Sequence, residues 1–368
     1  MTSAFLERWK LTIEPLTPIH IGAGQAVEPF EYTLQAQDDD WFLVAINLPA
    51  LFASLSPERR AQFDEVVRKG DLGGVRLWLQ GVVDSNRHRR FVVQVQAGAG
   101  EELLRNWGNP ERLGQIELST RHANSGVPYL PGSALKGAIR TAIVEQLCGS
   151  ARSPDSLQVL ARDSKYSSAR FEAAVLGHTR SSGGPDLYAD PFRQIAIEDA
   201  ALPDDGCYID RVQVVRRTKA DSQTTQGIRM YRDMTWSRSD GGNLVASTTV
   251  RVHRGMARER AVARALEVKE LIAACNRFYG ERLDAELQNF ADVIDDEASS
   301  LLRACKSSVA PNQCIVRLGR HSHFECCTVR KYATLPRRGV GKTRTLASVH
   351  EGAGLPLGWT LLTFEPHA

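Results

Sequence analysis

The sequence predicts an α+β protein, because segments with strand periodicity and segments with helical periodicity interleave without a regular βα repeat. This pattern fits α+β better than a doubly wound sheet. A chain of 368 residues that is 42% hydrophobic can bury one large core or two moderate ones, and the usual domain size favours two. We place them at residues 1–205, with an insertion around 150–190, and 206–368, with a helical insertion around 257–303.

Alternating apolar and polar residues predict a strand at residues 8–16, followed by a short extended stretch that ends in a glycine turn at Gly22–Gly24. The triplet Asp38-Asp39-Asp40 lies between two predicted strands, so we interpret it as a hairpin turn rather than a catalytic carboxylate cluster. Further strands are predicted at 41–46, 194–197, 208–215, 227–234, 245–252, 314–318 and 359–364.

Helical periodicity begins at Pro49 and runs to about Arg68. The clearest helix starts at residues 131–133, where Ser133 is the expected N-cap, and its apolar stripe ends before Gly149. Two more helices are predicted, one from residue 268 to Gly280 and one over residues 283–301. Residues 150–190 have no clean period and predict a long loop.

Charge is segregated along the chain, although the formal net charge is only +3. Residues 211–264 contain twelve Arg or Lys and four acids, and residues 306–350 contain nine Arg or Lys and one acid, Glu325. Residues 281–297 reverse the sign, with seven acids against Arg282. The basic segments indicate a polyanion partner, while the acidic run is either a second contact or a solvated face.

Seven cysteines form no CxxC pair, and no apolar run approaches the ~18 residues of a membrane span. We expect a cytoplasmic protein with reduced thiols and without a membrane segment or charged leader.

Two segments in the N-terminal half of the sequence are candidates for phosphate binding. At 131–140, the helix start offers free N–H groups, and Lys136 and Arg140 lie four residues apart on one face beside Ser133. The alternative is an ordinary amphipathic helix. In the stretch 17–24, His20 precedes Gly22 and Gly24; a buried core histidine is the alternative there. Val27 replaces the third glycine of a dinucleotide fingerprint.

Two further candidates lie in the second half. Gly341-Lys342-Thr343 resembles the end of a P-loop, but Pro336 replaces the required glycine, so we expect no nucleotide hydrolysis. The segment is still a glycine-rich basic loop suited to a phosphate chain, with its charges at Arg337, Arg338, Lys342 and Arg344. At 317–327, two His and two Cys near Cys314 allow zinc, but the spacing is irregular; we favour a turn at Gly319 that presents Arg320 and His321 to phosphate.

Four segments together resemble the RAMP proteins of type III CRISPR systems: TPIHIGAG, PYLPGSALKGAIRTA, VRLGRHSHFECCTV and PLGWTLLTFEP. Their order is most similar to that in the subunit of type III-A (Csm) complexes that caps the 3′ end of the guide RNA (crRNA). The resemblance implies tandem ferredoxin-like, RRM-like βαββαβ modules with a glycine-rich loop before the last strand. It places His20, Gly22 and Gly24 in the loop after the first strand, and Arg317, Arg320 and His321 among the RNA contacts of the second module. It also implies antiviral defence, with crRNA, target RNA, other RAMP subunits and host nucleases as partners.

From the resemblance we expect a non-enzymatic RNA-binding subunit that needs no cofactor and no metal. Two alternatives stay open. Related RAMP proteins cleave precursor guides without metal, and His20 would then be the general acid or base. A carboxylate and Mg²⁺ could instead cut target RNA, with Asp39 as the candidate. Reversing the charges of Lys136 and Arg140 is expected to weaken RNA binding in a native fold.

Overall fold

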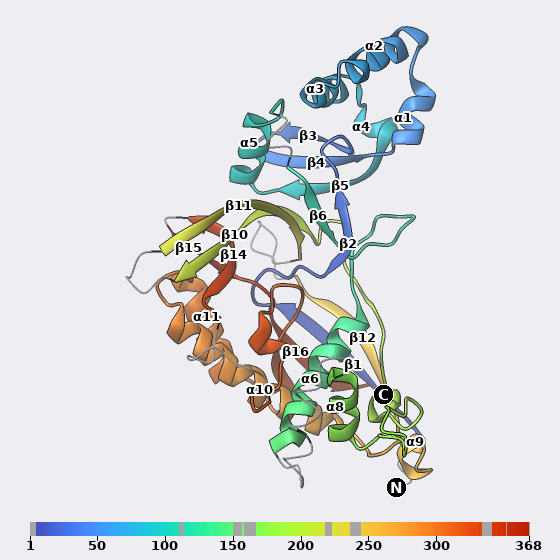
Figure 1. The fold of residues 1–368 in the computed structure, drawn as a ribbon, viewed down its shortest axis with the longest axis vertical. Helices are drawn as coiled ribbons and strands as arrows, with labels where there is room; N and C mark the ends of the chain where they lie inside the picture. Colours follow the sequence, from blue (N-terminus) through green and yellow to red (C-terminus); the bar gives the residue numbers. More distant parts are fainter. Residues whose placement is uncertain are drawn as a thin grey trace.

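A computed structural model describes residues 5–109, 114–149, 157, 167–217, 223–235, 244–332, 341–350 and 352–367. Figure 1 shows an elongated molecule with a small helical region at the top, a large curled sheet in the middle and a second sheet at the bottom. None of the helices in these ranges has the length and apolarity that a membrane span requires.

The lower sheet has five antiparallel strands in the order β13-β16-β1-β12-β8. They are β1 (Leu6–Pro15), β8 (Ile195–Ile197), β12 (Ala246–His253), β13 (Gln313–Arg317) and β16 (Trp359–Pro366). Strand β1 lies in the centre and pairs with both β12 and β16. Helices α6 (Gly132–Gly149) and α10 (Val268–Asn289) pack on the sheet and on each other (Figure 1). The chain order β1-α6-β8-β12-α10-β16 is the ferredoxin-like βαββαβ topology.

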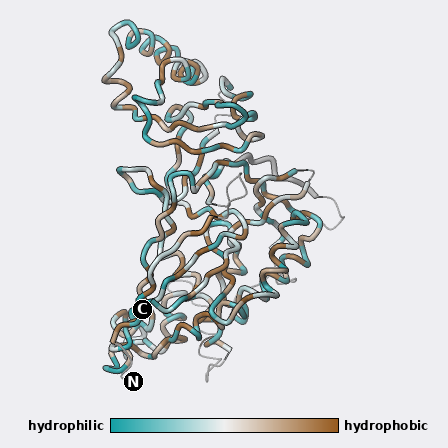
Figure 2. Tube along the Cα trace, turned by 180° about the vertical axis from the view of Figure 1, so that it is seen from behind, coloured by the Kyte–Doolittle hydropathy of each residue, from teal (hydrophilic) through white to brown (hydrophobic). Residues whose placement is uncertain are grey.

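The core of this module is formed where the two helices meet the sheet. Leu11 and Ile13 of β1, Ile139 of α6 and Phe364 of β16 are 0–1% exposed and belong to one hydrophobic cluster. Alternate residues of β1 are buried because side chains of a strand point to opposite faces. Figure 2 shows apolar stretches along these inner strands, with more polar residues on the outside. The predicted α+β, ferredoxin-like fold is thus confirmed.

The middle sheet contains nine strands, with the main path β2-β6-β11-β10-β5-β4-β3, while β14 pairs with β10 and with β15. The strands are β2 (Gly22–Val27), β3 (Tyr32–Gln37), β4 (Asp40–Ile46), β5 (Arg89–Val95), β6 (Ile116–Ser119), β10 (Tyr208–Arg217), β11 (Gln223–Met234), β14 (Thr343–His350) and β15 (Ala353–Pro356). Parallel pairs join β10 to β5 and β11 to β6, so this sheet is mixed. Strand β2 lies at its edge.

The helical region at the top has its own small core, which includes Leu51 and Leu79. It comprises α1 (Leu48–Ser54), α2 (Pro57–Arg68), α3 (Leu72–Val82) and α4 (Ser85–His88). The single helix predicted from Pro49 to Arg68 is divided because Ser56 caps α2, its side chain accepting a hydrogen bond from the Arg59 N–H. The other elements are α5 (Ala97–Arg105), α8 (Ser167–Leu176), α9 (Arg254–Arg258), α11 (Asp296–Ser307), the 3₁₀ turns Pro191–Gln194 and Phe324–Cys326, and the short pair β7 (Tyr129–Leu130) and β9 (Ala200–Ala201).

The two sequential domains predicted at 1–205 and 206–368 are not separate bodies in the structure. Each sheet takes strands from both halves of the chain, and β1 lies between β12 and β16. The helices expected as an insertion around 257–303 include α10, which packs on α6 and β13 and is part of the core. Of the insertion expected around 150–190, residues 150–156 and 158–166 lie outside the described ranges.

Three local predictions have clear outcomes. Asp38 and Asp39 form the two-residue turn between β3 and β4, as expected. Gly280 does not end a helix, because the buried stripe of α10 continues through Leu283 and Leu287. The predicted glycine-rich loop contains the β14–β15 hairpin, and Gly358 then turns the chain into β16 with φ 93°.

Candidate nucleic-acid interface

The two sheets meet at the connection between β1 and β2, where His20 lies. The carbonyl of His20 accepts a hydrogen bond from the Arg320 N–H (3.0 Å), and Ile19 pairs with Thr235 at the end of β11. Gly319 has φ 89°, and a Cβ at this position would overlap the His20 carbonyl oxygen. Glycine at 319 therefore lets the segment after β13 lie directly against the His20 backbone. We call His20, Glu117, Arg232, Arg320 and His321 the junction site.

His20 is a buried, neutral imidazole. Its side chain is fully enclosed, and its Nδ1 lies 2.8 Å from the carbonyl oxygen of Asp233. A carbonyl only accepts, so Nδ1 carries the proton and Nε2 keeps a lone pair. Burial lowers the pKa of His20, so the ring is uncharged at pH 7. Within the described residues, Nε2 has no hydrogen-bond partner, and a Cβ on Gly22 would lie only 2.9 Å from it.

His321 lies beside His20, with ring centroids 6.2 Å apart. Burial, followed by the charges near it, lowers the pKa of His321 to about 3. Its Nε2 also has no hydrogen-bond partner among the described atoms. The pair can accept or donate hydrogen bonds, but at neutral pH it supplies no positive charge.

Charge at the junction site comes from arginines that share Glu117. The Glu117 carboxylate is 3.0 Å from Arg232 and also binds Arg320, while His20 Nε2 is 3.9 Å away. The Arg320 side chain is 59% exposed, whereas that of Arg232 is 6% exposed. Arg320 is consequently the member placed to meet a solvent-side anion. Its ion pair with Glu117 is exposed enough to be weak and exchangeable.

Asp233 links several of the residues that surround the junction site through hydrogen bonds. The Arg121 guanidinium binds its carboxylate through Nε (2.9 Å) and Nη2 (2.8 Å), and the Ser119 N–H donates to it (3.2 Å). The Asp233 carbonyl accepts from both His20 and the Ser119 hydroxyl (2.5 Å). Sequence reasoning missed Glu117, Arg121 and Asp233. Arg232 at least lies in the basic segment 211–264 that the sequence identified.

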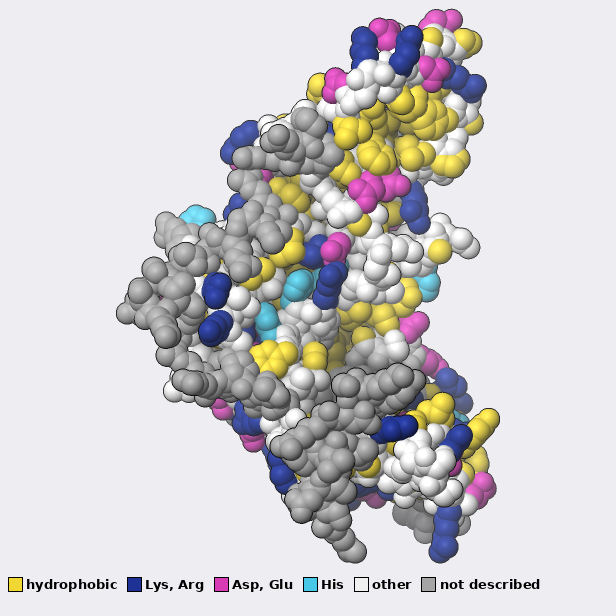
Figure 3. Space-filling model, viewed as in Figure 1, with side chains coloured by type: hydrophobic (Ala, Val, Ile, Leu, Met, Phe, Trp, Pro, Cys, Tyr) yellow, Lys and Arg dark blue, Asp and Glu magenta, His cyan; other side chains and the backbone are white. Residues whose placement is uncertain are grey.

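Strand β2 offers an open backbone next to this site. Gly22, Ala23, Gly24 and Gln25 are all exposed, and a Cβ on Gly24 would meet nothing within 4 Å. The predicted glycine turn is therefore part of an edge strand with little side-chain cover. Figure 3 shows basic and histidine side chains gathered in the middle of the face viewed, where the two main parts of the molecule meet.

Arg317 and Arg344 lie inside the protein, contrary to the predicted contact with phosphate. Their side chains are 1% exposed, and both pair with the buried Glu286, at 3.0 and 2.6 Å. Arg344 also binds Glu325, and the Trp359 Nε1–H donates to Glu286 (2.7 Å). The arginines lower the pKa of Glu286 although burial alone would raise it. This buried cluster joins α10, β13, β14 and β16.

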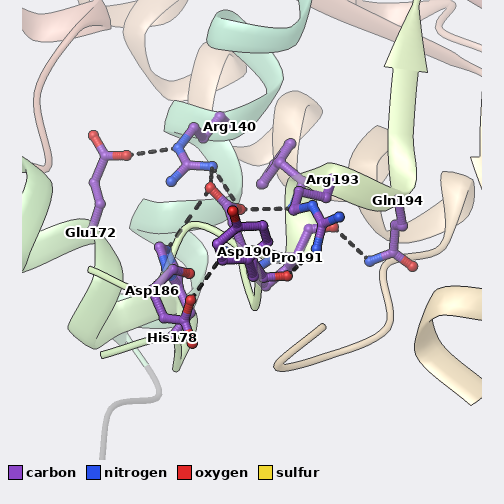
Figure 4. A network of polar contacts seen from close by, with 10 residues as sticks. Arg140, Glu172, His178, Asp186, Asp190, Pro191, Arg193 and Gln194 are labelled. Carbon is purple, nitrogen blue, oxygen red and sulfur yellow. Dashed lines mark hydrogen bonds and ion pairs between the residues drawn. The ribbon is translucent and has the colours of Figure 1, made fainter. Parts of the chain in front are cut away.

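The charges on helix α6 are also held by the protein. Arg140 binds Glu172 (2.7 Å) and both oxygens of Asp190 (3.0 and 2.9 Å), as Figure 4 shows. The Lys136 ammonium donates to the Ile195 carbonyl (2.7 Å). Both basic side chains of α6 therefore have partners within the protein and do not need RNA to pair with. Reversing both charges would set a carboxylate against Glu172 and Asp190, so the variant is no longer expected to keep a native fold.

The start of α6 has an internal anion already. The helix begins at Gly132, so Ser133 lies inside its first turn and is not the N-cap. The Asp199 carboxylate accepts from the Gly132 N–H (2.8 Å) and occupies the place predicted for phosphate. Ser133 and Gly137 are nevertheless exposed, and a Cβ on Gly137 would meet open space.

Three predicted residues belong to the glycine-rich basic loop before β14. Lys342 is exposed just before β14, whereas Arg337 and Arg338 lie outside the described residues. Zinc has no site in the part of the chain that the structure describes, where no cluster of three His, Cys, Asp or Glu side chains is arranged for a metal. Asp40 accepts a hydrogen bond from Gln94 (3.1 Å), which suits the hairpin.

This chain is similar to curated relatives, to solved structures and to a protein-family model. Two curated relatives, each described as "CRISPR system Cms protein Csm5" from Mycobacterium tuberculosis strains CDC 1551 / Oshkosh and ATCC 25618 / H37Rv, are 25% identical over 217 residues. That match spans 54% of this chain and 56% of each relative. A chain in a cryo-EM structure of a Csm–crRNA–target RNA ternary complex of a type III-A CRISPR-Cas system aligns with TM-score 0.64 and 18% identity, over 96% of this chain and 100% of that one.

The crystal structure of T. onnurineus Csm5 aligns with TM-score 0.59 and 16% identity, over 95% of this chain and 99% of that chain. At these identities, the two solved structures show that the fold is shared. The model of the RAMP superfamily matches residues 12–290, which is more than half of the sequence. The chain belongs to the RAMP superfamily.

Proposed function

We propose that this protein is a non-catalytic RNA-binding subunit of a type III-A CRISPR effector complex, where it holds the 3′ part of the guide RNA. The relatives support the complex, since they are named as a Csm subunit, and the similar chain comes from a complex with crRNA and target RNA. Other RAMP subunits and target RNA are then the expected neighbours, in the cytoplasm, and host nucleases would join for guide maturation.

One observation carries the RNA-binding part of the proposal: the exposed glycines of β2 lie beside Arg320 and the two neutral histidines. A strand edge without side chains lets a ribose-phosphate chain approach the backbone closely. Arg320 supplies a cation, and the exposed Lys342 just before β14 offers a second one. The His20 ring is fully enclosed, so it supports this edge from inside the protein and does not itself face the RNA.

The test removes the two exposed cations. In Arg320→Ala/Lys342→Ala, we expect weaker binding of single-stranded RNA and a shallower dependence on salt, because fewer phosphates are neutralised. Each lost phosphate contact should reduce the slope of log K against log salt by roughly 0.7 on a single strand. Fluorescence anisotropy over a series of salt concentrations measures both quantities.

The matched control is Arg68→Ala/Lys69→Ala, which removes two exposed cations from the end of α2. This variant should bind RNA like the unchanged protein. Equal salt slopes in all three proteins would refute the assignment of Arg320 and Lys342. Absence of RNA from the complex purified with its partner subunits would refute the function itself.

The alternative, metal-independent cleavage by His20, lacks a protonated imidazole at the junction site. Self-cleavage of RNA needs a base and an acid near the scissile bond. The lowered pKa of His20 and the pKa of about 3 for His321 leave both rings neutral at pH 7, so neither is a protonated imidazole. We expect no 2′,3′-cyclic phosphate when repeat RNA is incubated with the protein in EDTA. A cyclic product that disappears in His20→Ala would establish the nuclease instead.

A further inference from the structure

A cavity of about 340 Å³ opens between β2 and the strands β4 and β5. Its lining includes the buried Val27, Ala45 and Leu118 and the more exposed Gln25, Glu31 and Arg90. The volume is at the lower end of the roughly 300–1,000 Å³ typical of small-molecule sites, so it suits one small group. We call it the β2–β5 pocket.

Phe91 forms an aromatic wall in this pocket. Its ring is partly exposed, and the Arg121 guanidinium lies 4.9 Å from the ring centroid. Arg121 is fixed by its ion pair with Asp233 and by a hydrogen bond to the Gly126 carbonyl (2.9 Å). A Cβ on Gly126, where φ is 71°, would come within 3.0 Å of the Phe91 side chain. The ring is therefore held in place before any ligand arrives, as a stacking platform requires.

The polar side chains around Phe91 favour a nucleobase over a phosphate. Gln25 is exposed and offers an amide, and the exposed Arg90, whose guanidinium lies 5.8 Å from the Phe91 ring centroid, offers donors that can move to a base edge. Glu31 brings a carboxylate, whose Oε2 accepts from the Glu28 N–H (2.9 Å), and this charge would repel a phosphate. Base edges carry both donors and acceptors, so a mixed set of this kind can bind them.

The pocket is continuous with the proposed RNA path. Gln25, Ala26 and Val27 follow Gly22 and Gly24 within the same strand, so one end of β2 borders the junction site and the other borders the pocket. Resting on the proposed function, we propose that the β2–β5 pocket takes one unpaired base of the bound RNA. The base stacks on Phe91, and Gln25, Glu31 and Arg90 bind its edge.

The experiment combines RNA and protein changes in a double-mutant cycle. Single abasic ribose positions are scanned along a single-stranded RNA, and affinities are measured with the full chain by anisotropy. One position should weaken binding by roughly five-fold to a hundred-fold, which is the range for loss of one stacked base. In Ala26→Leu, which adds volume at a lining residue without a change of charge, the abasic and intact RNAs should bind equally if the base is excluded.

Arg90→Ala and Arg89→Ala provide a matched pair. They are consecutive exposed residues of β5, and of the two only Arg90 lines the pocket. Both variants remove one positive charge, but only Arg90→Ala should reduce the abasic effect. RNA binding without a sensitive position, or equal behaviour of the two variants, overturns the pocket while the proposed function stands. No RNA binding by the unchanged protein overturns both.

Discussion

Glu286→Gln is expected to destabilise the protein by about 3–5 kcal/mol, the usual cost of removing one partner from a buried ion pair. The substitution would leave Arg317 and Arg344 facing each other with only Glu325 as a counter-charge in the interior. The glutamine also fills nearly the same volume, so the loss reports charge rather than packing. Urea unfolding followed by circular dichroism measures the change.

Glu281→Gln is the matched control, because it changes the same residue type on the same helix. Glu281 is 52% exposed and pairs with the exposed Arg330, so its replacement should cost less than about 1 kcal/mol. Equal unfolding midpoints for the two variants would show that the buried cluster contributes little to stability.

The same cluster sets a direction for the dependence on pH. The pKa of Glu286 is lower in the folded protein than in the unfolded chain, so folding is favoured while the carboxylate is ionised. This contribution is fully present above the unfolded pKa and is lost as pH falls through the folded value. Unfolding titrations on the acid side should show a smaller loss of stability in Glu286→Gln than in the unchanged protein.

Gly319→Ala is expected to have the second large effect, on stability and on RNA binding together. Backbone strain at φ 89° alone costs about 1–3 kcal/mol for a residue with a Cβ. The added atom would also overlap the His20 carbonyl, so the segment that carries Arg320 and His321 must move away from His20. We expect a lower unfolding midpoint and weaker RNA binding by the part of the protein that remains folded.

Gly183→Ala separates backbone strain from steric overlap of the added Cβ. Gly183 has φ 82°, but a Cβ there would meet nothing within 4 Å, so only the backbone strain is expected to cost stability. This control should lose a small part of its stability and keep its affinity for RNA. If Gly319→Ala behaved in the same way, the contact between residues 319 and 20 would be unimportant for the junction site.

The fold could be predicted to the extent that it depends on local patterns. The apolar periodicity that predicts strands β1, β4 and β16 and helix α6 involves residues that are close together in the sequence. The sequence therefore locates these four elements well. The arrangement of strands depends on pairing between distant segments, such as β1 with β12 and β16. No local signal reports that pairing, so the sequence alone does not reveal that each sheet takes strands from both halves of the chain.

The candidate site was harder to predict because charge in the sequence does not reveal its partner. Arg317 and Arg344 look like free cations in a basic segment, but Glu286, from the acidic run, pairs with both, and Glu325 also binds Arg344. Arg140 is similarly held by Glu172 and Asp190. Of the residues predicted to bind phosphate, the exposed Arg320 and Lys342 keep the placement that the hypothesis requires.

The central position of β1 has a consequence for how the molecule is made. This strand leaves the ribosome before both of its neighbours, residues 246–253 and 359–366. Its two backbone edges therefore wait unpaired while the segments between them are made, exposed to other chains that could pair with them. Such a nascent chain would benefit from a chaperone or an early-binding assembly partner until β16 closes this side of the sheet.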